Sequence, residues 1–246
     1  MGRFAAIILA AGQGKRMRSP LPKVLHRVGG KPLLTWVVET ARAAGAERVV
    51  AVLGVGREQV EAVLPAGVES VVQEPQLGTG HAARCTEGRL KDYAGPIAVL
   101  SGDVPLLRAE SVRALAETRA REGAAVAVLT ARVSGPHAYG RVVRDAAGRV
   151  ARIVEHKDAT AAERAIDEIN TGTYVFAPGE LFPALAALRN DNAQGEYYLT
   201  DAVAFLAAQG KKVAGVLAPR ADECLGINTP EELAAAEQAL KSRSRT

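Results

Sequence analysis

The chain opens with a short apolar run that leads directly into a glycine-rich, basic loop. The run extends from Phe4 to Leu9, and Lys23 follows soon after a loop that reads Ala10-Ala11-Gly12-Gln13-Gly14-Lys15-Arg16-Met17. Apolar runs of this length predict a buried strand. Glycines allow backbone N–H groups to approach a ligand closely, and the cations face negative charge. The pattern therefore indicates a site for a nucleotide or another phosphorylated small molecule.

This loop matches neither of the two common phosphate-binding patterns. A P-loop requires glycine where Leu9 stands and Ser or Thr where Arg16 stands. A dinucleotide-binding fingerprint requires glycine where Met17 stands. On these residues alone, an ordinary strand-to-helix turn that contains glycines remains the alternative.

The composition is that of a soluble globular protein with small acidic ligands. The 246 residues, 48% hydrophobic and 24% charged, can bury a full core as one α/β domain. The net charge is +4, the arginines are dispersed and 4% of the residues are aromatic, whereas nucleic-acid surfaces cluster cations and aromatics. No apolar stretch is long enough to span a membrane, and the first run enters a glycine loop instead of a cleavage site. We therefore expect a cytoplasmic protein with no nucleic-acid or membrane partner.

The cysteines and histidines indicate neither a metal cluster nor covalent catalysis. Cys85 and Cys224 match no metal-ligand spacing, so two reduced thiols are expected. The four histidines share no common spacing: His26, His81, His137 and His156. The sequence also shows no nucleophile elbow and no Ser-His-Asp or Cys-His signature.

Strand-length apolar runs alternate with helical segments in the first half of the chain. Strands are predicted over Phe4–Ala11, Arg48–Leu53, Val68–Gln73 and Ile97–Ser101, and helices over Leu33–Ala44, Arg57–Leu64, Thr79–Leu90 and Ala109–Glu122. This order predicts a Rossmann-like, mostly parallel sheet flanked by helices.

After Gly123 the pattern changes to extended segments joined by short turns. These are predicted over Ala125–Val133, Gly140–Arg144, Val150–Glu155 and Asp167–Phe176, followed by helices over Leu199–Gln209 and Glu231–Lys241 with a strand over Lys212–Leu217 between them. We expect a small antiparallel extension of the sheet, and a polar, frayed tail over Ser242–Thr246.

Three polar segments fall at the carboxyl ends of the predicted parallel strands, where such sheets bind ligands. They are the Gly12 loop, the Gln73 segment and the turn that contains Asp103. A carboxylate at a strand end is a good Mg²⁺ ligand, with phosphates supplying further ligands. Asn228 also follows a short apolar element and precedes a helix. For both residues a turn or helix-capping role is the alternative.

Two further sets of polar residues fit the other parts of a sugar nucleotide. Gln73, with the backbone around Gly78 and Thr79, can both donate and accept, which suits the edge of a pyrimidine; Thr79 as a helix cap is the alternative. The second set offers a backbone N–H, a carboxylate and an amide for sugar hydroxyls and an acetamido group: Gly140, Glu155 and Asn170. Taken singly, each of these three could be a turn residue or a surface charge.

Together these motifs resemble one family over nearly the whole chain and in order. It is the uridylyltransferase (pyrophosphorylase) domain of the bacterial bifunctional N-acetylglucosamine-1-phosphate uridylyltransferase/glucosamine-1-phosphate acetyltransferase, one of the sugar nucleotidyltransferases. The runs that carry the resemblance are Leu9–Gly12, Leu21–His26, Gln76–Ala82, Gly102–Leu106, Tyr139–Arg141, Val154–Thr160, Glu168–Gly172 and Asn192–Asp201. The glycine loop is weakly specific, whereas Glu-His-Lys-Asp-Ala-Thr and Asn-Ala-Gln-Gly-Glu-Tyr-Tyr are much more specific.

The resemblance implies a fold of the nucleotide-diphospho-sugar transferase type and a role for each matching residue. The nucleotide would be lined by Leu9, Ala10, Ala11 and Gly12, and its phosphates would be held by Arg16 and Lys23. Uracil would be bound by Gln73, Gly78 and Thr79, and N-acetylglucosamine by Gly140, Glu155 and Asn170. Mg²⁺ would be bound by Asp103 and Asn228. The implied reaction transfers UMP from UTP to N-acetylglucosamine 1-phosphate, which gives a precursor of peptidoglycan. The implied domain spans residues 1–241, with a nucleotide part over about 1–123 and a sugar part over about 124–228.

The chain also departs from the family pattern. Ser101 stands where the family commonly has Tyr, Lys15 where a small Thr is frequent, and Asn228-Thr229 where it usually has Asn-Asn. The hexapeptide repeat of the acetyltransferase β-helix does not follow the last helix, so we expect no acetyltransferase activity and a monomer or weak homo-oligomer. Another sugar 1-phosphate or NTP is the first alternative, and a non-catalytic nucleotide-sugar-binding protein is the second.

Overall fold

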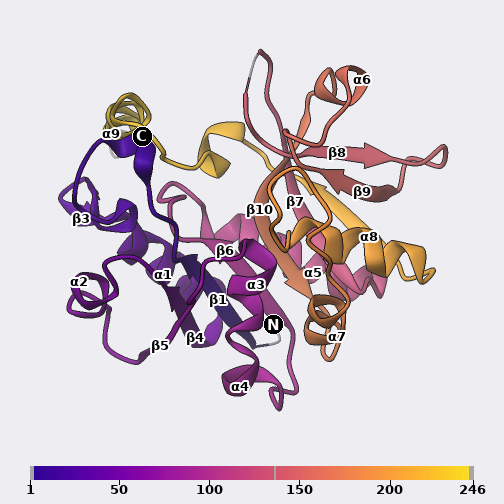
Figure 1. Ribbon diagram of the computed structural model, residues 1–246, viewed down its shortest axis with the longest axis horizontal. Coiled ribbons are helices and arrows are strands. Elements are labelled where there is room, and N and C mark those ends of the chain that lie inside the picture. Colours follow the sequence, from indigo (N-terminus) through magenta and orange to yellow (C-terminus); the bar gives the residue numbers. More distant parts are fainter. Residues whose placement is uncertain (1–2, 136, 244–246) are drawn as a thin grey trace.

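A mixed sheet of nine strands forms the centre of the molecule, which is described by a computed structural model over residues 3–135 and 137–243 (Figure 1). Its main path runs β11-β7-β10-β6-β1-β4-β5, and β8 and β9 join it at β10. The strands are β1 (Phe4–Ala10), β4 (Ala46–Leu53), β5 (Val68–Val72), β6 (Ile97–Ser101), β7 (Val126–Arg132), β8 (Arg141–Arg144), β9 (Val150–Val154), β10 (Glu168–Phe176) and β11 (Val213–Leu217).

The predicted mostly parallel sheet with an antiparallel extension is confirmed. Strand β1 pairs in parallel with β4 and β6, and β4 pairs in parallel with β5. Strand β10 lies between β6 and β7 and is antiparallel to both, and β8 and β9 form an antiparallel pair beside it. Because β10 comes from the second half of the chain, the two proposed parts share one sheet. The domain boundaries themselves stay a prediction.

Helices cover both faces of the sheet. Along β1 the side chains alternate, with Ala6 and Ile8 in one apolar cluster and Ala5 and Ile7 in the other. The first face is covered by α1 (Leu33–Ala44) and α5 (Ala109–Glu122), and the second by α3 (Thr79–Arg84), α4 (Glu87–Leu90), α7 (Leu181–Ala186) and α8 (Thr200–Ala208). The sheet is therefore buried on both sides, and its strand ends remain for ligands.

Two predicted helices are wrong in length. The single helix expected over Thr79–Leu90 is two helices, and the hydroxyl of Thr86 at the break donates to the Ala83 carbonyl at 2.7 Å. The helix expected to reach Leu64 is α2 (Arg57–Glu61), and a turn follows it in which the Val63 and Leu64 N–H groups donate to carbonyls three residues back. Leu64 itself precedes Pro65, a position that is disfavoured in a helix. These corrections do not move any predicted site residue.

Several short elements had no clear signal in the sequence. They are η1 (Lys15–Met17), η2 (Lys23–Leu25), β2 (Arg27–Val28), β3 (Lys31–Pro32), α6 (Ala161–Arg164), α7 and η3 (Ala221–Cys224). The last helix, α9 (Pro230–Arg243), packs beside the β2–β3 hairpin in a third apolar cluster that contains Val28, Ile227 and Ala236 (Figure 1). Of the tail predicted as frayed, residues 244–246 lie outside the described residues, whereas Arg243 donates to the Leu106 carbonyl at 2.8 Å.

Within residues 3–135 and 137–243, the longest helices are too short or too polar to cross a membrane. The cytoplasmic location stays a prediction.

Candidate functional site

Two cavities meet at the carboxyl ends of β1 and β6. The first has a volume of about 480 Å³ and is lined by the glycine loop and the segment from Gln73 to Thr79, including Leu9–Gln13, Lys23, Gln73, Gly78 and Thr79. The second has a volume of about 510 Å³ and includes Arg16, Gly140, Glu155, Asn170 and Asn228. Thr79, Ser101 and Asp103 line both. The structure thus brings all the predicted site residues to one edge of the sheet.

The glycine loop needs glycine at position 14 for two reasons. Gly14 has a φ of +61°, and a Cβ there would lie 2.6 Å from the Cβ of Lys23. The backbone then turns into η1, which presents Lys15 and Arg16 at the mouth of the site. In the described part of the chain neither side chain forms an ion pair. Both charges are therefore available to an anionic ligand.

Lys23 bridges the two residues predicted to bind a metal ion. Its Nζ donates to Asp103 Oδ2 and, at 3.0 Å, to Asn228 Oδ1. The side chains of Lys23 and Asp103 are each 16% exposed, so solvent screens this pair less than a surface pair. Lys23, Asp103 and Asn228 therefore lie together, with an ammonium group between the two oxygens, and their roles in phosphate and Mg²⁺ binding stay predictions.

The backbone holds Asp103 and Asn228 together and gives the capping role to a different residue. Asp103 follows β6, and its carbonyl accepts from the Ile227 N–H at 2.9 Å. Thr229 Oγ1 accepts from the Glu232 N–H at 3.2 Å, and the Glu232 carboxylate accepts from the Asn228 and Thr229 N–H groups. The capping alternative is therefore wrong for Asn228, whose side chain points to Lys23.

The donor set suits a hard divalent cation. It consists of one carboxylate oxygen and one amide oxygen that already hold a positively charged group, and Mg²⁺ prefers oxygen ligands and usually takes only a few from protein. In the described ranges no group of three or more His, Cys, Asp or Glu side chains could hold a metal ion. An ion at this site would thus need ligand phosphates or water for its other positions.

Gln73 is held in a fixed orientation at the end of β5. Its backbone N–H donates to the Leu53 carbonyl at 2.8 Å, which places the side chain at the carboxyl edge of the sheet. Its Nε2 donates to the Gly78 carbonyl at 2.8 Å and lies 3.2 Å from His81 Nδ1. Because the side chain is only 5% exposed, few other orientations are open to it.

Thr79 does not cap α3, so that alternative is wrong. Its Oγ1 accepts from the Leu199 N–H at 3.0 Å, and the neighbouring Gly80 N–H donates to the Tyr197 carbonyl at 2.7 Å. A Cβ on Gly78 would lie 2.6 Å from that same carbonyl oxygen. Residues 78–80 are thus held by residues 197–199, which lie far away in the sequence.

The three predicted sugar-binding residues line the second cavity. Thr200 Oγ1 donates to Glu155 Oε1 at 3.1 Å, and burial raises the pKa of Glu155, with Asp201 acting in the same direction. Asn170 Nδ2 donates to the Tyr174 hydroxyl at 2.7 Å, and its Oδ1 accepts from the Gly172 N–H at 3.1 Å. Each end of that amide keeps one further hydrogen-bonding position. The set can therefore bind several hydroxyl or amide groups.

Sequence reasoning missed three residues that position the site. The Tyr139 hydroxyl accepts from the Gly226 N–H at 3.1 Å, and burial raises its pKa to about 12. Gln76 Nε2 donates to the Ala11 carbonyl at 2.6 Å. A Cβ on Gly54 would lie 2.3 Å from that Nε2 atom. Tyr139 lies in a quoted motif, but nothing in the sequence indicates that Gln76 contacts Ala11.

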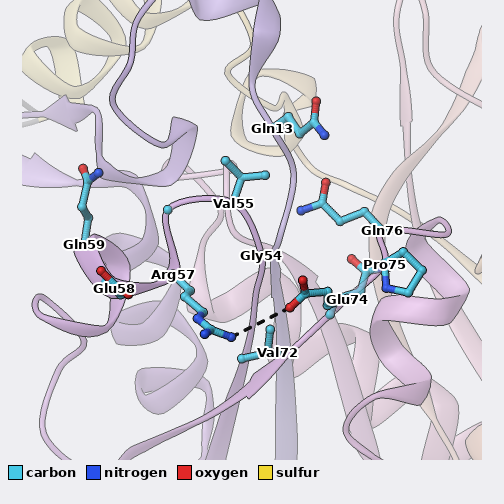
Figure 2. A pocket seen from close by; sticks show the side chains of 12 residues that line it. Gln13, Gly54, Val55, Arg57, Glu58, Gln59, Val72, Glu74, Pro75 and Gln76 are labelled. Carbon is cyan, nitrogen blue, oxygen red and sulfur yellow. Dashed lines mark ion pairs between the residues drawn. The ribbon is translucent and has the colours of Figure 1, made fainter.

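A third cavity of about 640 Å³ adjoins the first cavity and shares Gln13, Gln73 and Gln76 with it. Figure 2 shows its two walls, the loop after β4 and the loop after β5, with Gln76 pointing across toward Gly54. Arg57 and Glu74 pair across the floor at 4.0 Å; both are exposed, so the pair adds little stability. This edge of the first cavity is thus open and polar.

Comparison with known proteins gives the family. Residues 6–211 match the family model described as the MobA-like NTP transferase domain. The chain is 48% identical over 243 residues to "Bifunctional protein GlmU" of Oceanobacillus iheyensis (99% of this chain, 53% of the relative) and 49% identical over 238 residues to that of Geobacillus thermodenitrificans (97% and 52%). The chain therefore spans about half the length of these relatives. The family resemblance drawn from the motifs is confirmed.

A solved structure supports the same fold. It is "The Crystal Structure of UDP-glucose pyrophosphorylase complexed with UDP-glucose", with a TM-score of 0.79, 19% sequence identity and coverage of 99% of this chain and 100% of the other. At this identity the likeness concerns the fold alone. The matched family model covers most of the chain, from β1 to the end of α8, and we conclude that this chain belongs to the MobA-like NTP transferase family.

Proposed function

We propose that this chain transfers UMP from UTP to N-acetylglucosamine 1-phosphate, with Mg²⁺ as cofactor, and releases UDP-N-acetylglucosamine and pyrophosphate. The observation that carries the proposal is the meeting of two cavities at Thr79, Ser101 and Asp103, with Lys23 beside the junction. Two phosphorylated substrates bound in these cavities would bring their phosphates together beside cations. Membership of an NTP transferase family supports the same class of reaction.

The orientation of Gln73 supports a uracil base. Both amide hydrogens of Gln73 are directed to protein atoms, one to Gly78 and one to His81, so its Oε1 is left to accept a hydrogen bond. Uracil offers an N3–H donor at its edge, whereas cytosine offers an acceptor at that position. We therefore expect Gln73 to favour UTP.

The proposed chemistry depends on positioning and charge neutralisation. A phosphate oxygen of the sugar 1-phosphate attacks the α-phosphorus of UTP, and pyrophosphate leaves. Because the nucleophile is already an anion, little general-base work is needed, and the difficulty is to bring two polyanions together in line. Arg16 and Lys23 lie where they can neutralise the phosphates. Mg²⁺ held by Asp103 and Asn228 would supply further charge neutralisation.

The second cavity supports an N-acetylated sugar. The Glu155 carboxylate and the Asn170 amide keep free hydrogen-bonding positions and lie beside the Gly140 backbone. Hydroxyl groups can donate to the carboxylate, and an acetamido group can pair with the amide. A cytoplasmic location and a monomeric or weakly associated state fit this proposal.

A substrate panel tests the proposal. Pyrophosphate release is measured with Mg²⁺ for four NTPs, each with several sugar 1-phosphates. We expect strong preference for UTP with N-acetylglucosamine 1-phosphate. Preference for another pair would support the alternative of a different nucleotidyltransferase. Absence of Mg²⁺-dependent pyrophosphate release from every pair would leave a binding protein without turnover.

A further inference from the structure

The orientation of the Gln73 amide follows from its partners. The atom 2.8 Å from the Gly78 carbonyl oxygen must be the amide nitrogen, because a carbonyl oxygen can only accept. The same Nε2 atom lies 3.2 Å from His81 Nδ1. The amide oxygen is consequently the end that faces the nucleotide cavity, which Gln73 lines.

The same contact fixes the state of the His81 ring. Since Gln73 Nε2 donates, His81 Nδ1 must accept, which requires a neutral ring with its proton on Nε2. Burial lowers the pKa of His81, and the Arg84 guanidinium lowers it further, which outweighs the opposite effect of the Pro75 carbonyl. Arg84 is itself held over the Tyr197 ring, 5.1 Å from the ring centre. The neutral ring is therefore built into the local packing.

We propose that His81 is a specificity-determining positioning residue: it accepts a hydrogen bond from Gln73 and so keeps Gln73 Oε1 directed at the base. This inference rests on the proposed function, because it takes the base to lie against Gln73. His81 lies behind Gln73 and lines neither the nucleotide nor the sugar cavity, so it acts on the base only through Gln73.

Turning the amide of Gln73 over is the step that His81 opposes. The turned amide would present Nε2 to the base and would suit cytosine, whose N3 accepts. It would also place Oε1 against the Gly78 carbonyl, and His81 could then pair with Oε1 only after its proton had moved from Nε2 to Nδ1. Removal of the His81 acceptor leaves only the Gly78 carbonyl to oppose the turn, so discrimination between UTP and CTP should weaken.

Two substitutions of His81 separate this role from simple packing. His81→Leu removes the acceptor, whereas His81→Asn places an amide oxygen close to the position of Nδ1. Circular dichroism and thermal unfolding first show that both variants fold. The ratio of kcat/KM for UTP to that for CTP is then measured with the same sugar 1-phosphate. We expect a loss of about tenfold in this ratio for His81→Leu, the effect of about one hydrogen bond, and a change within about twofold for His81→Asn.

Three results would overturn the inference. One is a His81→Leu enzyme that keeps the wild-type ratio. Another is an equal loss of the ratio in both variants, which indicates packing alone. The third is independent of any nucleotide: ¹⁵N NMR of the free enzyme should show the His81 proton on Nε2, and a proton on Nδ1 would contradict the contact itself. A wild-type enzyme that does not prefer UTP over CTP would contradict the proposed function first, which distinguishes the two failures.

Discussion

Replacement of Lys23 by methionine should tighten the binding of a divalent ion in the absence of nucleotide, although it slows turnover. The Lys23 ammonium contacts Asp103 Oδ2 and lies 3.0 Å from Asn228 Oδ1, the two oxygens that we propose for Mg²⁺. An ion that takes both oxygens must displace this ammonium group. If Mg²⁺ binds these oxygens, as we propose, Lys23 competes with it until a triphosphate gives the ammonium another anionic partner.

The size of the effect follows from the contacts that are lost. The ammonium makes two hydrogen bonds, one of them to a carboxylate that is only 16% exposed. A hydrogen bond to a charged group is worth about 1.5–3 kcal/mol, so removal of the competitor should tighten metal binding by about tenfold to hundredfold. Turnover should fall by about a hundredfold or more, because loss of a pre-aimed cation raises the barrier by about 3 kcal/mol.

Titration with Mn²⁺, followed by electron paramagnetic resonance, measures the affinity without nucleotide. Lys15→Met is the matched control, because it removes the same charge from the neighbouring turn, where Lys15 forms no ion pair among the described residues. It should change the Mn²⁺ affinity by less than about twofold. A Lys23→Met protein that binds Mn²⁺ no more tightly than wild type would refute the reasoning. Adding Asp103→Ala to Lys23→Met should abolish the gain.

Three further predictions concern Asp103, Gly54 and Glu155. Asp103→Ala should reduce pyrophosphate release by about a hundredfold or more with an unchanged circular dichroism spectrum; near-normal Mg²⁺-dependent activity would exclude the metal assignment. Gly54→Ala would place a Cβ 2.3 Å from Gln76 Nε2, so it should destabilise the protein by about 1–3 kcal/mol and raise the KM for UTP. Gly88→Ala is the control, because the space around Gly88 is open, and it should neither destabilise the protein nor raise this KM. Glu155→Gln tests pH dependence. Burial raises the pKa of Glu155 above 4.5, so the folded wild type loses stability as pH rises through that pKa. As pH rises through the folded pKa of Glu155, the stability of the variant relative to wild type should therefore increase. The increase should be about 1.4 kcal/mol for each unit by which the folded pKa exceeds the unfolded pKa. A melting-temperature difference between the two proteins that is constant from pH 4 to pH 8 would contradict this.

The strands and their ligand-binding edge were predictable because their signal is local. β1 and β6 are buried on both faces and therefore appear as continuous apolar runs, and the polar residues that follow them necessarily lie at the same edge of a parallel sheet. This is why Gly12 and Asp103, which follow different strands, line one cavity. The reversed position of β10 between β6 and β7 had no such signal, because it depends on pairing between distant segments.

The supporting contacts of the site could not be predicted because each joins residues far apart in the chain. Gln76 and Ala11, or Lys23 and Asn228, share no spacing that marks them as partners. Gly54 resembles an ordinary turn glycine in the sequence, although the Gln76 amide and the Ala11 carbonyl leave no room for a side chain there. Such requirements become visible only when the loops are seen packed together.

One segment, residues 196–200, overlaps one of the two most specific motifs of the chain and links the two cavities. The Tyr197 N–H donates to the Leu77 carbonyl at 2.8 Å, and the Leu199 N–H donates to Thr79 Oγ1 at 3.0 Å, so the segment supports the loop that contains Gly78 and Thr79. The next residue, Thr200, donates to Glu155 in the second cavity at 3.1 Å. A shift of this segment would disturb both cavities together. The motif, whose Glu196 also lines the first cavity, therefore connects the two cavities.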